Sequence, residues 1–437
     1  MIQKIEQNYL VYTLFSIFVI LCLNKTGIPL VISLLGLIAC ILGFIKKETI
    51  LNKSILYLLI TYNVVCMISS LITTKNLFTG YVGTQLICTI ILILLGFLST
   101  KEQQHLKKLS IIFSLTVSIL GILLFFINGF TGNGFRLDIL FDNSNVLGIF
   151  MVITCFLIKE VNNQKLNLLT PLVIVTLALT LSIGSTIALI LGLVILTFTK
   201  YKKDSLKNKI FYFLEELSNM IIPYIIGILM YISINKLNSL TFSLILMIYL
   251  VIYITQYKKI IDFFKLHKKL NIVIFIFSLF TLLIIITLRN NFISTFLERI
   301  EMIIEGINLS FHNPIVGIGP LSFNMMNALS QGKYFNTNYI HNLWIHNSTE
   351  LGILAATLLV IIFIKVIKIK KSPEAQSGLI ATTIHYFMDV GFMYLGITTL
   401  LMILLNKEGQ EILSNKIKNR ILIIYLILFI TMLIAYI

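Results

Sequence analysis

The sequence predicts an all-α polytopic membrane protein, a bundle of roughly 13–15 spanning helices with one long extracytoplasmic loop that carries short helices. Two observations predict this fold class. Of the 437 residues, 58% are hydrophobic and only 12% are charged, whereas an ordinary soluble domain is about half apolar and about a quarter charged. Apolar stretches also recur along the whole chain. This composition excludes soluble enzymes, nucleic-acid-binding proteins, disordered chains and secreted disulfide scaffolds.

The expected spans are stretches of about 20 predominantly apolar residues. They run near residues 9–23, 28–44, 54–73, 81–99, 109–128, 143–158, 167–182, 184–199, 219–236, 239–256, 270–288, 346–364, 376–405 and 421–437. The stretch 376–405 reads as a pair of short helices. The chain therefore divides into an N-terminal transmembrane bundle (1–288), an extracytoplasmic loop (289–345) and C-terminal transmembrane helices (346–437).

Lysine and arginine set the expected orientation, because cytoplasmic loops collect them. With the N-terminus in the cytoplasm, most of the 34 Lys and Arg residues fall in inside segments. The net charge of +16 is thus typical of cytoplasmic loops and of contacts with anionic lipid head groups, not of nucleic-acid binding. The polar residues that map outside include three of the four arginines and four of the six histidines: Arg136, Arg289, Arg299, His312, His341, His346 and His385.

The long connection 289–345 is the strongest candidate for a functional segment, since long ordered loops are usually functional. Apolar residues at helical spacing in 292–307, with charged residues between them, predict an amphipathic helix on the membrane surface. Turn-forming residues follow in 312–320. The loop ends in a polar segment, 339–352, that re-enters the membrane.

We expect no metal and no cofactor. The five cysteines lie in apolar stretches without metal-site spacing. A zinc site from His341, His346 and Glu350 is the alternative, but the chain has no His-Glu-x-x-His run. Asn347 and Glu350 are also spaced as a helix N-terminal cap.

An ordered pattern of residues runs through this loop. An arginine on a helix is followed by a Gly-x-Gly turn with a later Phe, then by His-Asn and by Glu-x-Gly. The residues are Arg299, Gly317, Gly319, Phe323, His341, Asn342, Glu350 and Gly352. Upstream, Arg136 precedes an Asn-Ser-Asn run that ends in Asn145, and downstream a short segment holds His385 and Asp389. The pattern resembles that of the O-antigen ligases and the O-antigen and capsular polysaccharide polymerases.

The resemblance departs from the family at one place. In a mid-chain hairpin the family often has a Ser-Arg pair, where this chain reads Leu-Thr-Leu-Ser-Ile-Gly at 179–184. The number of cations that contact phosphate is therefore left open.

The resemblance implies a membrane glycosyltransferase that uses an undecaprenyl-diphosphate-linked donor at the outer face of the cytoplasmic membrane. His341 suits the catalytic base, because a histidine can be neutral near neutral pH. Guanidinium groups bind phosphate oxygens in a bidentate way that lysine does not reproduce. The expected substrate-binding residues are Arg136, Arg299, Arg289, Asn145, Asn342, Glu350, His385, Asp389, Gly317 and Gly319.

Three of these assignments have alternatives. Arg289 follows a span directly, where a side chain commonly extends to the interface. His385 and Asp389 are four residues apart, so we expect them on one helix face, where they line the acceptor path, hold His341 or bond only to each other.

The favoured activity is a metal-independent polymerase that joins lipid-linked repeat units into capsular, O-antigen or exopolysaccharide. A ligase that transfers the glycan to a lipid or protein acceptor is the first alternative, and a lipid-linked glycan flippase is the second. The expected partners are the undecaprenyl-diphosphate-linked glycan, membrane lipids and a regulator of chain length, with no nucleic acid.

Overall fold

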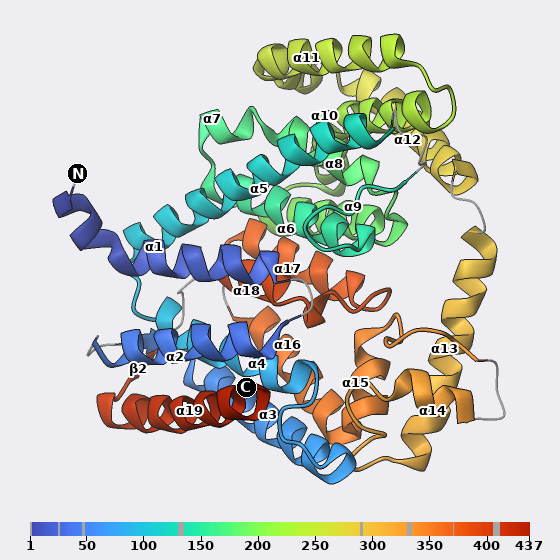
Figure 1. Ribbon diagram of the computed structural model, residues 1–437. Helices are drawn as coiled ribbons and strands as arrows, with labels where there is room; N and C mark the ends of the chain where they lie inside the picture. The colour runs from blue at the N-terminus through green and yellow to red at the C-terminus, as the bar shows by residue number, and fades with distance from the viewer. Residues whose placement is uncertain are drawn as a thin grey trace. The chain divides into compact units, whose positions relative to one another are not determined.

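The structure is a computed structural model that describes residues 2–24, 27–45, 49–129, 135–288, 292–329, 334–369, 371–404 and 411–437. These residues are mostly α-helical, as the sequence predicts (Figure 1). Within the described ranges, seven helices are long and apolar enough to cross a membrane: Lys53–Thr74, Thr100–Ile127, Ser144–Val161, Ile183–Lys200, Leu206–Asn235, Thr241–Leu266 and Asn415–Tyr436. This agrees with a multi-pass membrane protein, while the larger span count stays a prediction.

The chain forms two compact units, each built from separate stretches of sequence. Unit 1 combines Met1–Leu106, Ile293–Lys371 and Tyr386–Ile437, and unit 2 combines Lys107–Phe292 and Ser372–His385. These units do not follow the three segments 1–288, 289–345 and 346–437, which describe the expected membrane topology along the chain.

Unit 1 holds the helices at both ends of the chain and the long connection. Its elements are α1 (Ile2–Leu23), α2 (Pro29–Ile45), β1 (Thr49–Leu51), α3 (Lys53–Thr74), α4 (Tyr81–Leu95), the start of α5 (Thr100–Gly129), α13 (Phe292–His312), α14 (Phe323–Leu329), α15 (Leu343–Leu351), α16 (Ile353–Lys368), the 3-10 helix η1 (Gly391–Met393), α18 (Leu395–Leu404), β2 (Glu411–Leu413) and α19 (Asn415–Tyr436). The last helix, α19, packs along α2.

Unit 2 is a helical bundle built around α6 and α8, whose side chains are almost all buried. Its elements are the rest of α5, α6 (Ser144–Val161), α7 (Gln164–Asn167), α8 (Thr170–Leu179), α9 (Ile183–Lys200), α10 (Leu206–Asn235), α11 (Leu240–Leu266), α12 (Lys268–Leu288) and α17 (Pro373–His385). Although α17 comes late in the chain, it packs on α6 and α9.

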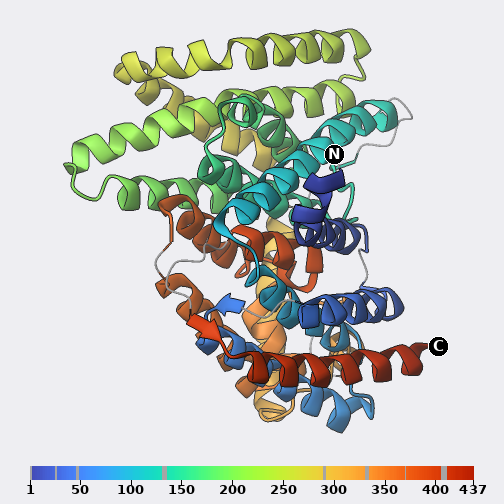
Figure 2. The same cartoon turned by 90° about the vertical axis from the view of Figure 1, so that its left-hand side faces the viewer.

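A short strand pair in unit 1 was not predicted from the sequence. Strands β1 and β2 are antiparallel, with Ile50 opposite Ile412, and Figure 2 draws both as arrows. Lys53 pairs with Glu411 across this ribbon at 3.2 Å. Three residues per strand are too few to produce a recognisable alternation of apolar and polar residues.

The predicted amphipathic helix exists as α13 and extends five residues beyond the predicted end, to His312. One side packs inward through Met302, Gly306 and Ser310. The opposite side leaves large apolar side chains exposed: Ile293, Phe296, Leu297, Ile300 and Ile304. An exposed apolar face beside a charged one is typical of helices that lie in a membrane interface.

The expected span 346–364 is interrupted at Gly352. Helix α15 ends at Leu351 and α16 begins at Ile353, because Gly352 has φ of 89°, which helical residues do not adopt. The stretch 376–405 is predicted to form a pair of short helices, and it contains α17 and α18.

Candidate functional site

The structure brings His341 and Asp389 together in unit 1. Nδ1 of His341 lies 3.5 Å from Oδ1 of Asp389. The carboxylate is 1% exposed, whereas the imidazole side chain is 26% exposed. Nδ1 itself is buried, so the exposed part of the ring lies away from the carboxylate. This arrangement places Nδ1 against the buried carboxylate and leaves another part of the ring accessible.

Arg299 approaches the same carboxylate from helix α13. Its Nη2 lies 3.9 Å from Oδ2 of Asp389, and its Nη1 donates to the carbonyl oxygen of Met388 at 2.9 Å. Nε of Arg299 is buried and has no hydrogen-bond partner among the described residues. The guanidinium therefore holds the 388–389 backbone, and the Arg299 side chain remains 20% exposed.

The segment 386–390 is fixed against the start of α15. The N–H of Leu343 donates to the carbonyl oxygen of Tyr386 at 2.9 Å, and Nδ2 of Asn342 donates to that of Phe387 at 3.2 Å. Oδ1 of Asn342 also caps α15 by accepting from the N–H of Ile345 at 3.0 Å. Asn342 thus positions its neighbour His341 relative to Asp389 through contacts within the protein.

The two glycines of the Gly-x-Gly turn allow two backbone segments to approach each other closely. The N–H of Ile318 donates to the carbonyl oxygen of Thr349 at 2.9 Å, and that of Gly319 donates to Glu350 at 3.0 Å. A Cβ on Gly317 would overlap the backbone of Glu350. Gly317 and Gly319 also have φ of 70° and 103°, which favour glycine. These glycines were predicted to bind substrate, and the contacts seen here are with the protein itself.

Glu350 holds the same turn through its buried side chain. Oε2 accepts from the N–H of Leu321 at 2.9 Å and from the Tyr81 hydroxyl at 2.8 Å. Oε1 accepts from the N–H of Phe323 at 3.2 Å. Protein donors thus surround this carboxylate, which fits a role in positioning the loop. Sequence reasoning missed Tyr81, because it lies about 270 residues away and no local motif marks it.

His346 lies in the interior beside this network, with Nε2 at 3.5 Å from Oε2 of Glu350. The Tyr339 ring meets it edge-on, 5.4 Å between centroids. Burial raises the pKa of Tyr339 to about 12, so its hydroxyl stays protonated near neutral pH.

The alternative zinc site gains no support, since no three His, Cys, Asp or Glu side chains in the described ranges are grouped to hold a metal ion.

Arg136 and Asn145 meet in unit 2. Nη2 of Arg136 donates to Oδ1 of Asn145 at 2.9 Å, and Nε donates to the carbonyl oxygen of Thr180 at 2.8 Å. Asn143 caps α6 just before Asn145. Thr180 belongs to the segment 179–184, which joins α8 to α9, so the Arg136 guanidinium bonds to the turn between these two helices.

Three further predicted residues are His385, Asp389 and Arg289. His385 and Asp389 do not share a helix face, so that prediction is wrong. Helix α17 ends at His385, and Asp389 follows a turn at 386–388. Asp389 approaches His341 instead. Arg289 lies outside the described residues.

The Gly352 break gives a stability prediction. Gly352→Ala places a Cβ against the carbonyl oxygen of Ile315 at a φ of 89°, and a strained backbone of this kind costs about 1–3 kcal/mol. We expect a lower apparent melting temperature for the purified protein in detergent. Gly121→Ala is the control, since its Cβ would meet only flexible side-chain atoms, the nearest being Leu137 Cδ2 at 3.2 Å. Equal melting temperatures for both variants would contradict the packing described.

Comparisons with known proteins add no relative. No model of a known protein family matches the chain, and a search of curated proteins finds no similar sequence.

Proposed function

We propose that this protein is a glycosyltransferase of the cytoplasmic membrane that polymerises undecaprenyl-diphosphate-linked repeat units into a capsular, O-antigen or exopolysaccharide. The observation that carries the proposal is the His341–Asp389–Arg299 cluster. In it a partly exposed imidazole and a guanidinium each lie within 4 Å of one buried carboxylate. The ordered sequence pattern that contains His341 and Arg299 supplies the substrate class.

The reaction needs a base for the acceptor hydroxyl. In the proposed step, Nε2 of His341 takes the proton while the hydroxyl oxygen bonds to the anomeric carbon of the donor sugar. The bond from that carbon to the diphosphate oxygen breaks, and the electron pair leaves with the polyprenyl diphosphate. A positioned base of this kind typically contributes about 10²- to 10⁴-fold in rate.

Asp389 acts through His341. A buried carboxylate facing Nδ1 keeps the proton on that nitrogen, so Nε2 is free to accept one. Its negative charge also stabilises the imidazolium that forms during transfer. The 3.5 Å separation is typical of a site without substrate, because such contacts tighten in the reacting complex.

Arginine provides the cation for the leaving diphosphate. Guanidinium forks match phosphate oxygens in pairs, and the Arg299 side chain beside Asp389 is 20% exposed, so part of its fork is open to an anion. Arg136 is the second proposed diphosphate contact on the sequence pattern alone. With His341 as base and arginine as cation, the proposed reaction proceeds without a metal ion.

The proposed orientation puts these residues on the extracytoplasmic side. In unit 2, Arg136 bonds near the start of α6 and the end of α8, whereas Lys159 and Lys200 lie near the other ends of α6 and α9. Because lysine-rich helix ends favour the cytoplasm, the end of this unit that holds Arg136 faces outward.

Arg299→Lys tests the guanidinium role. We expect loss of most polymer, because an ammonium group keeps the charge but cannot reproduce paired contacts to phosphate. The measurement is the length distribution of cell-surface polysaccharide at matched protein levels, and Arg136→Lys is expected to behave alike. Arg420→Lys, at an exposed position on α19, is the matched control. Wild-type chain lengths in the Arg299 and Arg136 variants would show that paired guanidinium contacts to phosphate are not required.

A deletion strain tests the proposed activity against its rivals. Loss of a polymerase leaves single repeat units on the surface. Loss of a ligase, the second candidate, leaves long chains on the carrier lipid. Loss of a flippase leaves lipid-linked units on the cytoplasmic side. Only the first outcome agrees with the proposal.

A further inference from the structure

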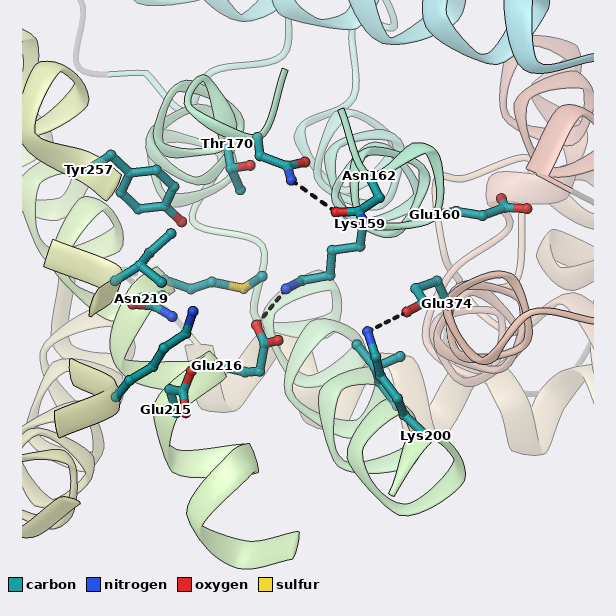
Figure 3. Close-up of a pocket in the computed structure, with 15 residues that line it drawn as sticks. Lys159, Glu160, Asn162, Thr170, Lys200, Glu215, Glu216, Asn219, Tyr257 and Glu374 are labelled. Carbon is teal, nitrogen blue, oxygen red and sulfur yellow. Dashed lines mark hydrogen bonds and ion pairs between the residues drawn. The ribbon is translucent and has the colours of Figure 1, made fainter. Parts of the chain in front are cut away.

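Unit 2 contains a cavity of about 500 Å³ that the proposed reaction does not use. Helices α6, α9, α10, α11 and α17 contribute its walls, and most of the side chains that line it are charged or amide-bearing (Figure 3). In the orientation proposed above, these lysine-rich helix ends lie at the cytoplasmic head-group level, far along α6 from Arg136.

Most charges around the cavity are already paired. Lys159 binds Glu216 at 2.5 Å, and Lys200 binds Glu374 at 2.8 Å, as the dashed lines in Figure 3 mark. Glu160 is paired with Lys107 at 2.6 Å. The opposite charges within each pair cancel, so the pairs favour neither a purely anionic nor a purely cationic ligand.

One charge of each sign is left over. Glu215 lines the cavity and forms no ion pair with a described residue. Lys265 also lines it, is 55% exposed, and has its described ion pair with Asp262 at 3.7 Å on the helix surface. Such an exposed pair contributes little, so Lys265 remains available to an anion.

A buried acceptor lies in the same wall. Asn219 is only 7% exposed, and its Oδ1 accepts no hydrogen bond from the described residues. Asn219 is one turn beyond Glu215 on α10, so both face the same side of the helix. That oxygen has almost no accessible surface, so Asn219 forms part of the cavity wall beside Glu215 but its Oδ1 is not in reach of a ligand in the cavity.

We propose that this cavity binds a zwitterion that carries a primary ammonium and a phosphate, the chemistry of an ethanolamine phospholipid head group. The ammonium donates to the carboxylate of Glu215, and the phosphate pairs with Lys265. A choline head group is excluded from the same site, because a quaternary ammonium has no N–H to donate. Of this assignment, only the cytoplasmic location rests on the proposed function.

The test is lipid retention by the purified full chain, measured by native mass spectrometry after exchange into mixed phosphatidylethanolamine and phosphatidylcholine. We expect about tenfold preferential retention of phosphatidylethanolamine, since one charge-assisted hydrogen bond is worth about that factor. Glu215→Gln should abolish the preference, Lys265→Gln should lower the retention of both lipids because both carry the phosphate, and Lys203→Gln, which does not line the cavity, should change neither. Lys265 is largely exposed, so its variant tests the proposal even if the Glu215 variant folds poorly.

A second arm separates the two sources of this chemistry. Soluble glycerophosphoethanolamine that raises the melting temperature of the wild type, but not of Glu215→Gln, indicates a free zwitterion as ligand. Lipid retention without that shift indicates the phospholipid. Equal retention of both lipids by the wild type, retention of phosphatidylglycerol alone, an unchanged preference in Glu215→Gln, or unchanged retention in Lys265→Gln would overturn the proposal. None of these readouts depends on glycan transfer, so the proposed function can fail separately.

Discussion

Replacing His341 with alanine is expected to lower glycan transfer by about 10²- to 10⁴-fold, the usual contribution of a positioned general base. The imidazole is the exposed partner of a buried carboxylate, so alanine removes the proton acceptor without disturbing a packed core. The measurement is the length distribution of surface polysaccharide in a deletion strain that carries the variant, with the protein level in the membrane matched to the wild type.

His312→Ala is the matched control for this substitution. His312 lies at the end of α13, is exposed, and contacts the backbone carbonyl oxygen of Asn308 at 2.8 Å. We expect normal chains from it. Long polymer made by a His341→Ala protein that is inserted in normal amounts would show that the base is another group.

Replacing Asp389 with asparagine is expected to cost about 10²- to 10⁴-fold in rate while leaving the fold intact, because the two side chains have the same shape. The amide removes the charge that stabilises a protonated ring and also allows the ring to take the wrong tautomer. Steady-state transfer rates of the reconstituted variant and of the wild type measure this loss.

The melting temperature separates a role in positioning His341 from a general loss of structure. A variant that only loosened the protein would melt at a lower temperature, whereas Asp389→Asn should melt as the wild type does. Asp204→Asn, in the loop after α9, is the charge-matched control and should leave both the rate and the melting temperature unchanged. A wild-type rate for Asp389→Asn would show that Asp389 does not contribute to catalysis.

The all-α class and several elements could be predicted because they depend on local pattern. Apolar stretches of spanning length and the spacing of apolar residues in 292–307 are properties of neighbouring residues. The sequence also marked His341, Arg299 and Asp389 as separate polar residues. Contact of the His385 and Asp389 pair with His341 is one of three roles that the sequence allows. The sequence alone does not select it, because Asp389 and His341 are 48 positions apart and come from different loops.

The glycines and Glu350 show a different limit. Their spacing was recognised, but spacing alone does not say whether a glycine makes room for a ligand or for another backbone. In the structure, Gly317 and Gly319 meet the 349–350 backbone, and Glu350 accepts from the turn that these glycines form. Likewise, four-residue spacing suggested a shared helix face for His385 and Asp389, but the helix ends at His385. A helix end without a Gly or Pro signal is hard to locate from sequence.

The most direct test of the account measures polyprenyl diphosphate released by the purified protein. The protein is reconstituted in liposomes with lipid-linked repeat units extracted from the deletion strain, and the released carrier and the glycan products are quantified by mass spectrometry. The account predicts one polyprenyl diphosphate for each new glycosidic bond, with release lost in His341→Ala and retained in His312→Ala. Release that is independent of His341, or movement of the lipid-linked glycan across the bilayer with no carrier released, would contradict it.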